Sequence, residues 1–266
     1  MRRLQALKQL GRVVNRRRFG PRPLLIDARP VVRLGTQYGG WSLLARESLR
    51  GSVVVSCGVG EDVSFDIELM TQYGVQVWFV DPTPRALAHL QGLQERLGAS
   101  AEGAFSSGGK QPLDSYDLSR IKSWQFKVVP AAVSDMTGTA RFFAPPTSEG
   151  VSYSLTNFQN SYVGDTPWIE VQVVSLPDLL DEIQSEISIL KMDIEGAEVE
   201  AIAALAKSPH RPHQILVEYD ELSRPSAHSR ERFELGHNRL LRVGYRPFHF
   251  DGRTCVSYVH VKQQQG

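Results

Sequence analysis

Residues 53–62 and 77–81 hold the residue types from which an adenosine site can be built. The apolar run Val53–Cys57 ends at Gly58 and Gly60, and a second apolar run ends at Asp81, about 20 residues beyond that turn. Glycines there allow a tight turn and close approach of the backbone to a ligand, and Asp81 is placed to accept hydrogen bonds from both ribose hydroxyls. The pattern predicts a βαβ unit that binds an adenosine-bearing cofactor, with an ordinary strand-to-helix turn as the simpler alternative.

The glycine pattern also bears on which cofactor is bound. A dinucleotide fingerprint reads G-x-G-x-x-G, but the position three after Gly60 is Val63. The sequence has no arginine or serine-rich turn at this point that would bind a pyrophosphate, and S-adenosylmethionine contains no phosphate. The residues therefore favour S-adenosylmethionine over a dinucleotide.

A third apolar run, 187–192, is followed by acidic residues, and this segment resembles a known signature. Leu190–Glu198 reads Leu-Lys-Met-Asp-Ile-Glu-Gly-Ala-Glu and resembles the signature of the FkbM-type methyltransferases. Further segments resemble family blocks in the expected order, namely 132–135 with 138–142, 175–179 and 216–219. The resemblance covers roughly residues 50 to 250. It implies an enzyme that uses S-adenosylmethionine and commonly methylates hydroxyl groups.

This chain departs from the family at the cofactor's methionine end. Family members usually carry an acid two residues before the first glycine, where it binds the cofactor's amino group, and this chain has Ser56. Cys57–Asp62 resembles a divergent branch that has Glu and Asp just after the glycines. The resemblance implies that Glu61 or Asp62 supplies the lost carboxylate. Ser56 is kept among the predicted cofactor contacts.

Methyl transfer to an alcohol needs a base at the cofactor edge of the sheet. Ligands of open α/β sheets bind at the carboxyl ends of the strands, so Asp193 and Glu195 are expected in the same crevice as Gly58 and Asp81. Asp193 is the first candidate for the base or for orienting the acceptor and for contact with the cofactor, and Glu195 is the second. The alternative is that both acids cap the helix expected to start at Gly196.

Other polar residues follow neighbouring strands. Ser134 and Asp135 are predicted beside the adenine, where they would accept from its exocyclic amine, although Gly138 also indicates a simple hairpin turn. Glu218 ends another strand at the same edge, with a structural ion pair as an equal alternative.

Alternating patterns after residue 50 predict a doubly wound α/β fold. Strands are expected near 53–57, 76–80, 126–133, 187–192 and 214–219, and helices near 62–73, 84–97, 176–184, 196–206 and 226–243. Two runs around Asp251-Gly252 predict a C-terminal antiparallel hairpin. A mainly parallel sheet finished in this way matches the Rossmann-like class I methyltransferase fold. Residues 98–112 are interpreted as a flexible insertion, and 144–168 either as a loop closing over an acceptor or as a surface hairpin.

The 266 residues are predicted to form one methyltransferase domain, 51–262, after a basic extension with lead-in helices at 1–50. A net charge of +1 argues against nucleic acid as a partner. Met1–Pro23 carries eight Arg or Lys and no acid, which predicts weak contact with an anionic membrane surface or acidic partner, or a solvated tail. No signal peptide or long apolar run is found, so a cytoplasmic location is expected, with a transit peptide as the lesser alternative.

Two cysteines, Cys57 and Cys255, are interpreted as core thiols, and no metal-ligand spacing is found. Three functions stay open at this point. The first is an O-methyltransferase acting on a hydroxyl of a small molecule or glycan. The second is a methyltransferase-like binding protein without catalysis. The third is a nucleotide-dependent oxidoreductase, against which the missing third glycine speaks.

Overall fold

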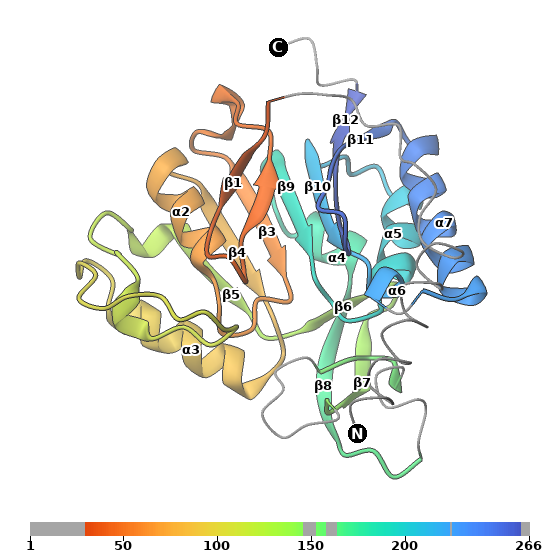
Figure 1. Ribbon diagram of the computed structural model, residues 1–266, viewed down its shortest axis with the longest axis horizontal. Helices are drawn as coiled ribbons and strands as arrows, with labels where there is room; N and C mark the ends of the chain where they lie inside the picture. The colour runs from red at the N-terminus through yellow and green to blue at the C-terminus, as the bar shows by residue number, and fades with distance from the viewer. Residues whose placement is uncertain (1–29, 146–152, 158–163, 224, 262–266) are drawn as a thin grey trace, which may run out of the picture.

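The computed structural model describes residues 30–145, 153–157, 164–223 and 225–261 (Figure 1). Its centre is a seven-stranded sheet in the order β11-β12-β10-β9-β3-β4-β5. These strands are β3 (Val53–Cys57), β4 (Gln76–Val80), β5 (Phe126–Val129), β9 (Ile187–Met192), β10 (Gln214–Glu218), β11 (Tyr245–Phe250) and β12 (Cys255–His260). Strands β3, β4, β5, β9 and β10 are parallel, and β12 runs antiparallel to both of its neighbours. The mostly parallel α/β sheet agrees with the sequence-based prediction.

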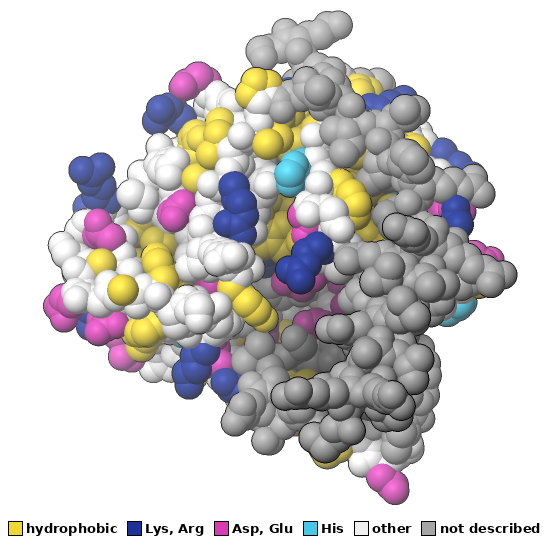
Figure 2. Space-filling model, in the orientation of Figure 1, with side chains coloured by type: hydrophobic (Ala, Val, Ile, Leu, Met, Phe, Trp, Pro, Cys, Tyr) yellow, Lys and Arg dark blue, Asp and Glu magenta, His cyan; other side chains and the backbone are white. Residues whose placement is uncertain are grey.

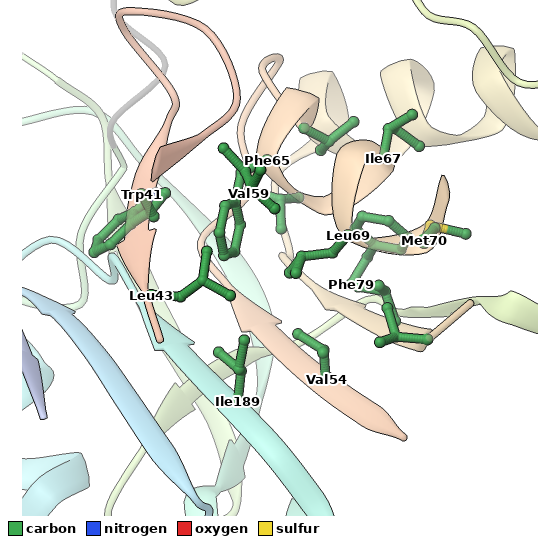
Figure 3. Close-up of a cluster of buried hydrophobic side chains, with 14 of the residues drawn as sticks. Trp41, Leu43, Val54, Val59, Phe65, Ile67, Leu69, Met70, Phe79 and Ile189 are labelled. Atoms are coloured by element: carbon green, nitrogen blue, oxygen red, sulfur yellow. The ribbon is translucent and has the colours of Figure 1, made fainter. Parts of the chain in front are cut away.

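Helices cover both faces of the sheet (Figure 1). They are α2 (Ser64–Tyr73) and α3 (Pro84–Glu95) on one face, and α4 (Leu176–Asp181), α5 (Glu198–Lys207) and α7 (Ala227–Arg242) on the other, with the short α6 (Asp220–Ser223) beside α7. Neighbouring strand residues enter opposite cores: Val54 packs with Phe65 and Leu69 of α2 (Figure 3), whereas Val55 belongs to the α5 side. Burial on both faces explains why these strands read as continuous apolar runs.

Local signals set where several helices begin. Thr83 is the N-cap of α3 and its hydroxyl accepts from the Ala86 amide, while Pro84 occupies the first turn. Ser175 caps α4 in the same way, as the sequence predicts. Across the described residues, no helix combines the length and the apolar character needed to cross a membrane.

Residues 30–50 differ from the expected lead-in helices. They form a small antiparallel sheet of β1 (Val32–Leu34) and β2 (Trp41–Leu43), followed by a 3-10 turn at Glu47–Leu49. Trp41 and Leu43 are buried and Ser42 between them is less so, which is the period of two of a strand with one face in the core. The expected helices are therefore wrong here, and the basic segment before residue 30 lies outside the described residues.

The strand expected at 126–133 is two strands in two different sheets. β5 ends at Val129, because Pro130 has no amide hydrogen to continue the ladder with β4. β6 (Ala132–Ser134) then pairs with β8 (Trp168–Ser175), which also pairs with β7 (Gly138–Phe143). This three-stranded sheet projects below the carboxyl edge of the main sheet (Figure 1).

Gln214 attaches the β1–β2 segment to the main sheet. Its side-chain amide is 1% exposed, accepts from the Leu44 amide at 2.8 Å and donates to the Leu44 carbonyl at 3.0 Å. Gln214→Leu would leave both buried backbone groups unpaired, so we expect the free energy of unfolding in urea to fall by about 2–4 kcal/mol. Gln91→Leu, at an exposed position on α3, is the control and should change it little. Equal effects of the two substitutions would contradict this attachment.

Candidate active site at the carboxyl edge of the sheet

The strand register brings the predicted residues together. Neighbouring strands end in register, and backbone hydrogen bonds from the Gly58 and Asp193 amides continue the ladder beyond the strand ends. As a result Asp81, Gly58, Asp193 and Glu218 lie in one row across four strands. All four line a single cavity of about 1780 Å³. It opens beside the point where the strand order reverses, between β3 and β9, which is where open α/β sheets bind ligands.

Glycine is required at positions 58 and 60 for two different structural reasons. A Cβ at Gly58, where φ is 71°, would lie 1.6 Å from the carbonyl oxygen of Asp193, so no other residue fits between the two turns. A Cβ at Gly60, where φ is 54°, would meet no atom within 4 Å. At Gly60 the constraint is the left-handed backbone alone, and the residue leaves open space beside the cavity.

Asp81 clamps the glycine turn. One carboxylate oxygen accepts from the Val59 and Gly60 amides at 3.0 and 3.2 Å, and the other accepts from the Thr83 amide and hydroxyl at 2.8 and 2.6 Å. A carboxylate offers about four lone-pair sites, so these four bonds use them all. A ribose hydroxyl would have to replace one of them, and the predicted ribose contact of Asp81 stays a prediction.

Amides at the start of α2 are also bonded within the protein. The Ser64 amide donates to Asp62 at 3.1 Å, and the Val63 amide donates to the Tyr116 hydroxyl at 3.2 Å. Phosphate sites at helix N-termini depend on amides that point at the ligand. Together with the Asp81 clamp, these bonds leave little for a pyrophosphate to bind.

Glu61 and Asp62 line the cavity while holding its walls together. Glu61 forms an ion pair with Arg85 at 2.6 Å. Asp62 accepts from the Thr36 hydroxyl at 2.7 Å and from the Gln111 side chain at 3.0 Å. These bonds tie the β1–β2 loop and the 98–112 segment to the start of α2.

Ser56 does not reach the cavity. Its side chain is fully buried and faces α2, in register with Lys191 on β9, because side chains alternate along β3. Asp66 of α2, 1% exposed, lies in the same neighbourhood. Burial raises the pKa of Asp66 to about 6, and Lys191 and Ser56 partly offset the rise. A buried carboxylate near Ser56 thus comes from α2, and the sequence signal for it was an acid in the first turn of a buried helix.

Ser134 and Asp135 also lie outside the cavity. The Ser134 hydroxyl donates to the Asp135 carboxylate at 3.2 Å on the exposed surface. The wall at this point is Ala131–Val133. β6 leaves the main sheet after Pro130 and carries Ser134 and Asp135 away from the crevice, so the geometry does not support their predicted contact with adenine.

Asp193 has no hydrogen-bond partner for its carboxylate within the described residues, and it lines the cavity. Burial raises its pKa well above the usual range, the nearby Glu218 raises it further, and Lys191 opposes the rise. Glu198, the first residue of α5, accepts from the Ile194 and Gly196 amides of the preceding turn at 2.9 and 3.0 Å, and Ala197 at the N-cap leaves the start of α5 without a side-chain cap. Asp193 therefore does not cap α5.

Glu195 lines the cavity with a strained backbone. Its φ is 55°, a left-handed value that no other non-glycine residue adopts in the described part of the chain. The Ser154 hydroxyl donates to its carbonyl. Tyr153 and Leu155, in the described part of the 144–168 loop, line the cavity as well. Strain of this kind is held where the surrounding structure over-determines the backbone, as at many binding sites.

Lys191, Tyr38 and Trp41 are among the cavity residues that were not predicted from the sequence. Lys191 is 4% exposed, and its ammonium donates to the Gly58 carbonyl at 2.7 Å. Its signal was the single charge in a mostly apolar strand. Tyr38 and Trp41 come from the β1–β2 segment, and no local pattern marked them.

The cavity is rich in carboxylates. Figure 2 shows acidic side chains around a hollow on this face, with basic side chains nearby. The lining acids are Glu61, Asp62, Asp81, Asp193, Glu195, Glu218 and Asp251, and the lining basic residues are Arg33, Lys191, His249 and Arg253. This balance suits a ligand that carries positive charge. Among the described residues, no group of His, Cys, Asp and Glu has the arrangement of a metal site.

A mostly parallel α/β sheet with its cavity at the strand-order reversal has the architecture of a methyltransferase-like protein. The family model described as the methyltransferase FkbM domain matches residues 56–247. The chain therefore belongs to the FkbM methyltransferase family, as the Leu190–Glu198 signature predicted.

One solved structure is similar in part. The crystal structure of methyltransferase FkbM from Methylobacillus flagellatus KT matches 80% of this chain at 17% identity, with a TM-score of 0.44. The match covers 44% of the length of that protein. No curated protein matches this chain.

Asp66 gives a testable pH dependence. Its folded-state pKa is raised to about 6 from 3.8, so the folded protein holds this proton more tightly than the unfolded chain. The resulting stability is present below about pH 4 and is lost as the pH rises through about 6. We expect Asp66→Asn to remove this loss. The free energy of unfolding of the variant minus that of wild type should therefore increase by roughly 2–3 kcal/mol between pH 4 and about pH 7.

Urea unfolding at several pH values measures this difference. Asp114→Asn, a change at an exposed carboxylate, is the control and should follow the wild-type profile. Parallel pH profiles for wild type and Asp66→Asn would contradict the raised pKa.

Proposed function

We propose that this protein is an S-adenosylmethionine-dependent methyltransferase that methylates a hydroxyl group of a small molecule or glycan. Its family supports methyl transfer. The observation that carries the cofactor assignment is the Asp81 clamp, because it occupies the Val59 and Gly60 amides that a dinucleotide pyrophosphate would need. A cofactor without phosphate needs no such amides.

The charge of the cavity supports the same assignment. S-adenosylmethionine carries a sulfonium and an ammonium group, and the row of residues at the sheet edge includes Asp81, Asp193 and Glu218. Carboxylates in a partly desolvated cavity favour a cationic ligand. They disfavour the negatively charged phosphates of a nucleotide-dependent oxidoreductase.

Asp193 is the proposed base. S-adenosylmethionine, when bound, supplies a methyl group made electrophilic by its sulfonium. In transfer to an alcohol, the methyl–sulfur bond would break as the acceptor oxygen bonds to the methyl carbon, S-adenosylhomocysteine would leave, and a carboxylate oxygen of Asp193 would take the hydroxyl proton. Burial and the neighbouring Glu218 raise the pKa of Asp193 toward the working range of a base. The Thr254 hydroxyl donates to Glu218 at 2.9 Å and orients it.

Aromatic side chains around the cavity support an organic acceptor with apolar faces. They are Tyr38, Trp41, Phe142, Tyr153 and Phe250. Such surfaces pack against sugar or small-molecule rings, while polar groups fix the reacting hydroxyl. A membrane-surface contact through the basic N-terminus stays a prediction, because that segment lies outside the described residues.

The cofactor assignment is tested by ligand-induced stabilisation. S-adenosylhomocysteine should raise the thermal unfolding midpoint, since a ligand that binds only the native state stabilises it, by about 2.7 kcal/mol at 100 times its Kd. NAD at the same concentration should leave the midpoint unchanged. Stabilisation by NAD with no response to S-adenosylhomocysteine would refute the assignment and favour the oxidoreductase.

The role of Asp193 is tested by Asp193→Asn with labelled S-adenosylmethionine and cell extracts as the source of acceptors. Turnover should fall by roughly 10²- to 10⁴-fold while affinity for S-adenosylhomocysteine stays near wild type. Wild-type rates should rise with pH across the neutral range, because the raised pKa keeps part of Asp193 protonated there. Asp181→Asn, at a carboxylate bonded to His210, is the control.

A near-normal rate for Asp193→Asn would remove Asp193 from the mechanism. Cofactor binding by the wild-type protein without transfer to any acceptor would favour the non-catalytic binding protein.

A further inference from the structure

Lys191 is a buried cation inside the cavity. It lies on β9, is 4% exposed, and its ammonium sits 5.2 Å from the ring centroid of Trp41. It donates to the Gly58 carbonyl at 2.7 Å. An ammonium has three N–H donors, and this is the one bond it makes to the described part of the chain.

Burial of a lysine is costly unless its charge has a direct partner. Among the described residues, no carboxylate forms an ion pair with Lys191. Asp66 and Asp193 are close enough that Lys191 lowers the pKa of each, but neither is bonded to it. Lys191 thus lies near negative charges, and N–H donors of its ammonium remain available to an anionic group in the cavity.

The other lining cations are placed differently. The Arg33 guanidinium donates to the carbonyls of Thr36, Gln37 and Gly40, so it is engaged by its own loop. Arg253 is exposed, in the turn between β11 and β12. Lys191 is therefore the buried positive charge beside the glycine turn.

The position of Lys191 relative to that turn identifies the ligand group. Asp81 lies on the β4 side of Gly58, and Lys191 and Trp41 lie on the β9 side. A cofactor that crosses the turn with its ribose toward β4 has its amino-acid end toward β9. We propose that Lys191 binds the carboxylate at the methionine end of S-adenosylmethionine, an inference that rests on the proposed function.

A purely structural role of Lys191 would give a different experimental result. If Lys191 only holds the Gly58 turn through its carbonyl, its loss would weaken every cofactor analogue to the same extent. If it binds the carboxylate, its loss would weaken only ligands that carry that carboxylate. A pair of ligands that differ by the carboxylate separates the two roles.

The test is titration calorimetry of wild type and Lys191→Met with S-adenosylhomocysteine and with its decarboxylated analogue. Wild type should bind S-adenosylhomocysteine about 10- to 100-fold more tightly than the analogue, the usual range for a hydrogen bond to a charged group. In Lys191→Met this preference should disappear through loss of S-adenosylhomocysteine affinity. Lys127→Met is the matched control, since Lys127 lies 5.5 Å from the Trp78 ring on the exposed side of β5, and it should keep the wild-type preference.

Three results would overturn the proposal. They are an equal loss of affinity for both ligands in Lys191→Met, an unchanged preference in that variant, and wild-type protein that binds the two ligands equally. The last needs no variant and so applies even if Lys191→Met fails to fold. Wild-type protein that binds neither ligand would instead refute the cofactor assignment itself, and the role of Lys191 with it.

Discussion

The close contact between Gly58 and the Asp193 carbonyl is the constraint on which the site depends. The turns after β3 and β9 occupy space that a single extra methyl group would fill. Because these turns touch, Asp193 lies beside the glycine turn, and the Lys191 ammonium reaches the Gly58 carbonyl. Asp81 holds the other side of the turn through its backbone amides. One absent side chain thus lets four strand ends converge on one cavity.

The charges near this contact lower the stability of the fold. Asp66 and Lys191 are buried and Asp193 is half-buried around the ends of β3 and β9, where each ion loses hydration. Their mutual attraction offsets part of that cost, yet Lys191 has no direct ion pair within the described residues and Asp193 accepts no hydrogen bond there. Groups left short of partners in a cavity are those that a ligand can satisfy, which is why perturbed pKa values gather at functional sites.

Segments far apart in the chain complete the cavity. The β1–β2 loop brings Tyr38 and Trp41, the 98–112 segment brings Gln111 against Asp62, and Tyr153 comes from the long loop before β8. Asp62 joins the first two of these through Thr36 and Gln111. This part of the cavity wall is therefore built on segments that the parallel sheet does not define, which is how one fold can carry different functions.

Much of this protein could be predicted from the sequence because the deciding patterns are local. Apolar runs, the Gly58–Gly60 turn, the helix caps at Thr83 and Ser175 and the Asp251-Gly252 turn each specify their element through neighbouring residues. The row of Asp81, Gly58 and Asp193 follows as well, because parallel strands of one sheet end at one edge.

Only the tertiary structure decided which of the predicted residues face the cavity. Ser56 points to α2 because of its place in the pleat, and Ser134 and Asp135 are carried off because β6 joins another sheet. Residues 30–50 form the β1–β2 pair because Trp41 and Leu43 pack on a core assembled from the rest of the chain. Lys191 acquires its position only when Trp41 and Gly58 meet it from distant parts of the sequence. Local propensity determines the elements, whereas the direction of a side chain and its partners depend on contacts that form when the elements pack.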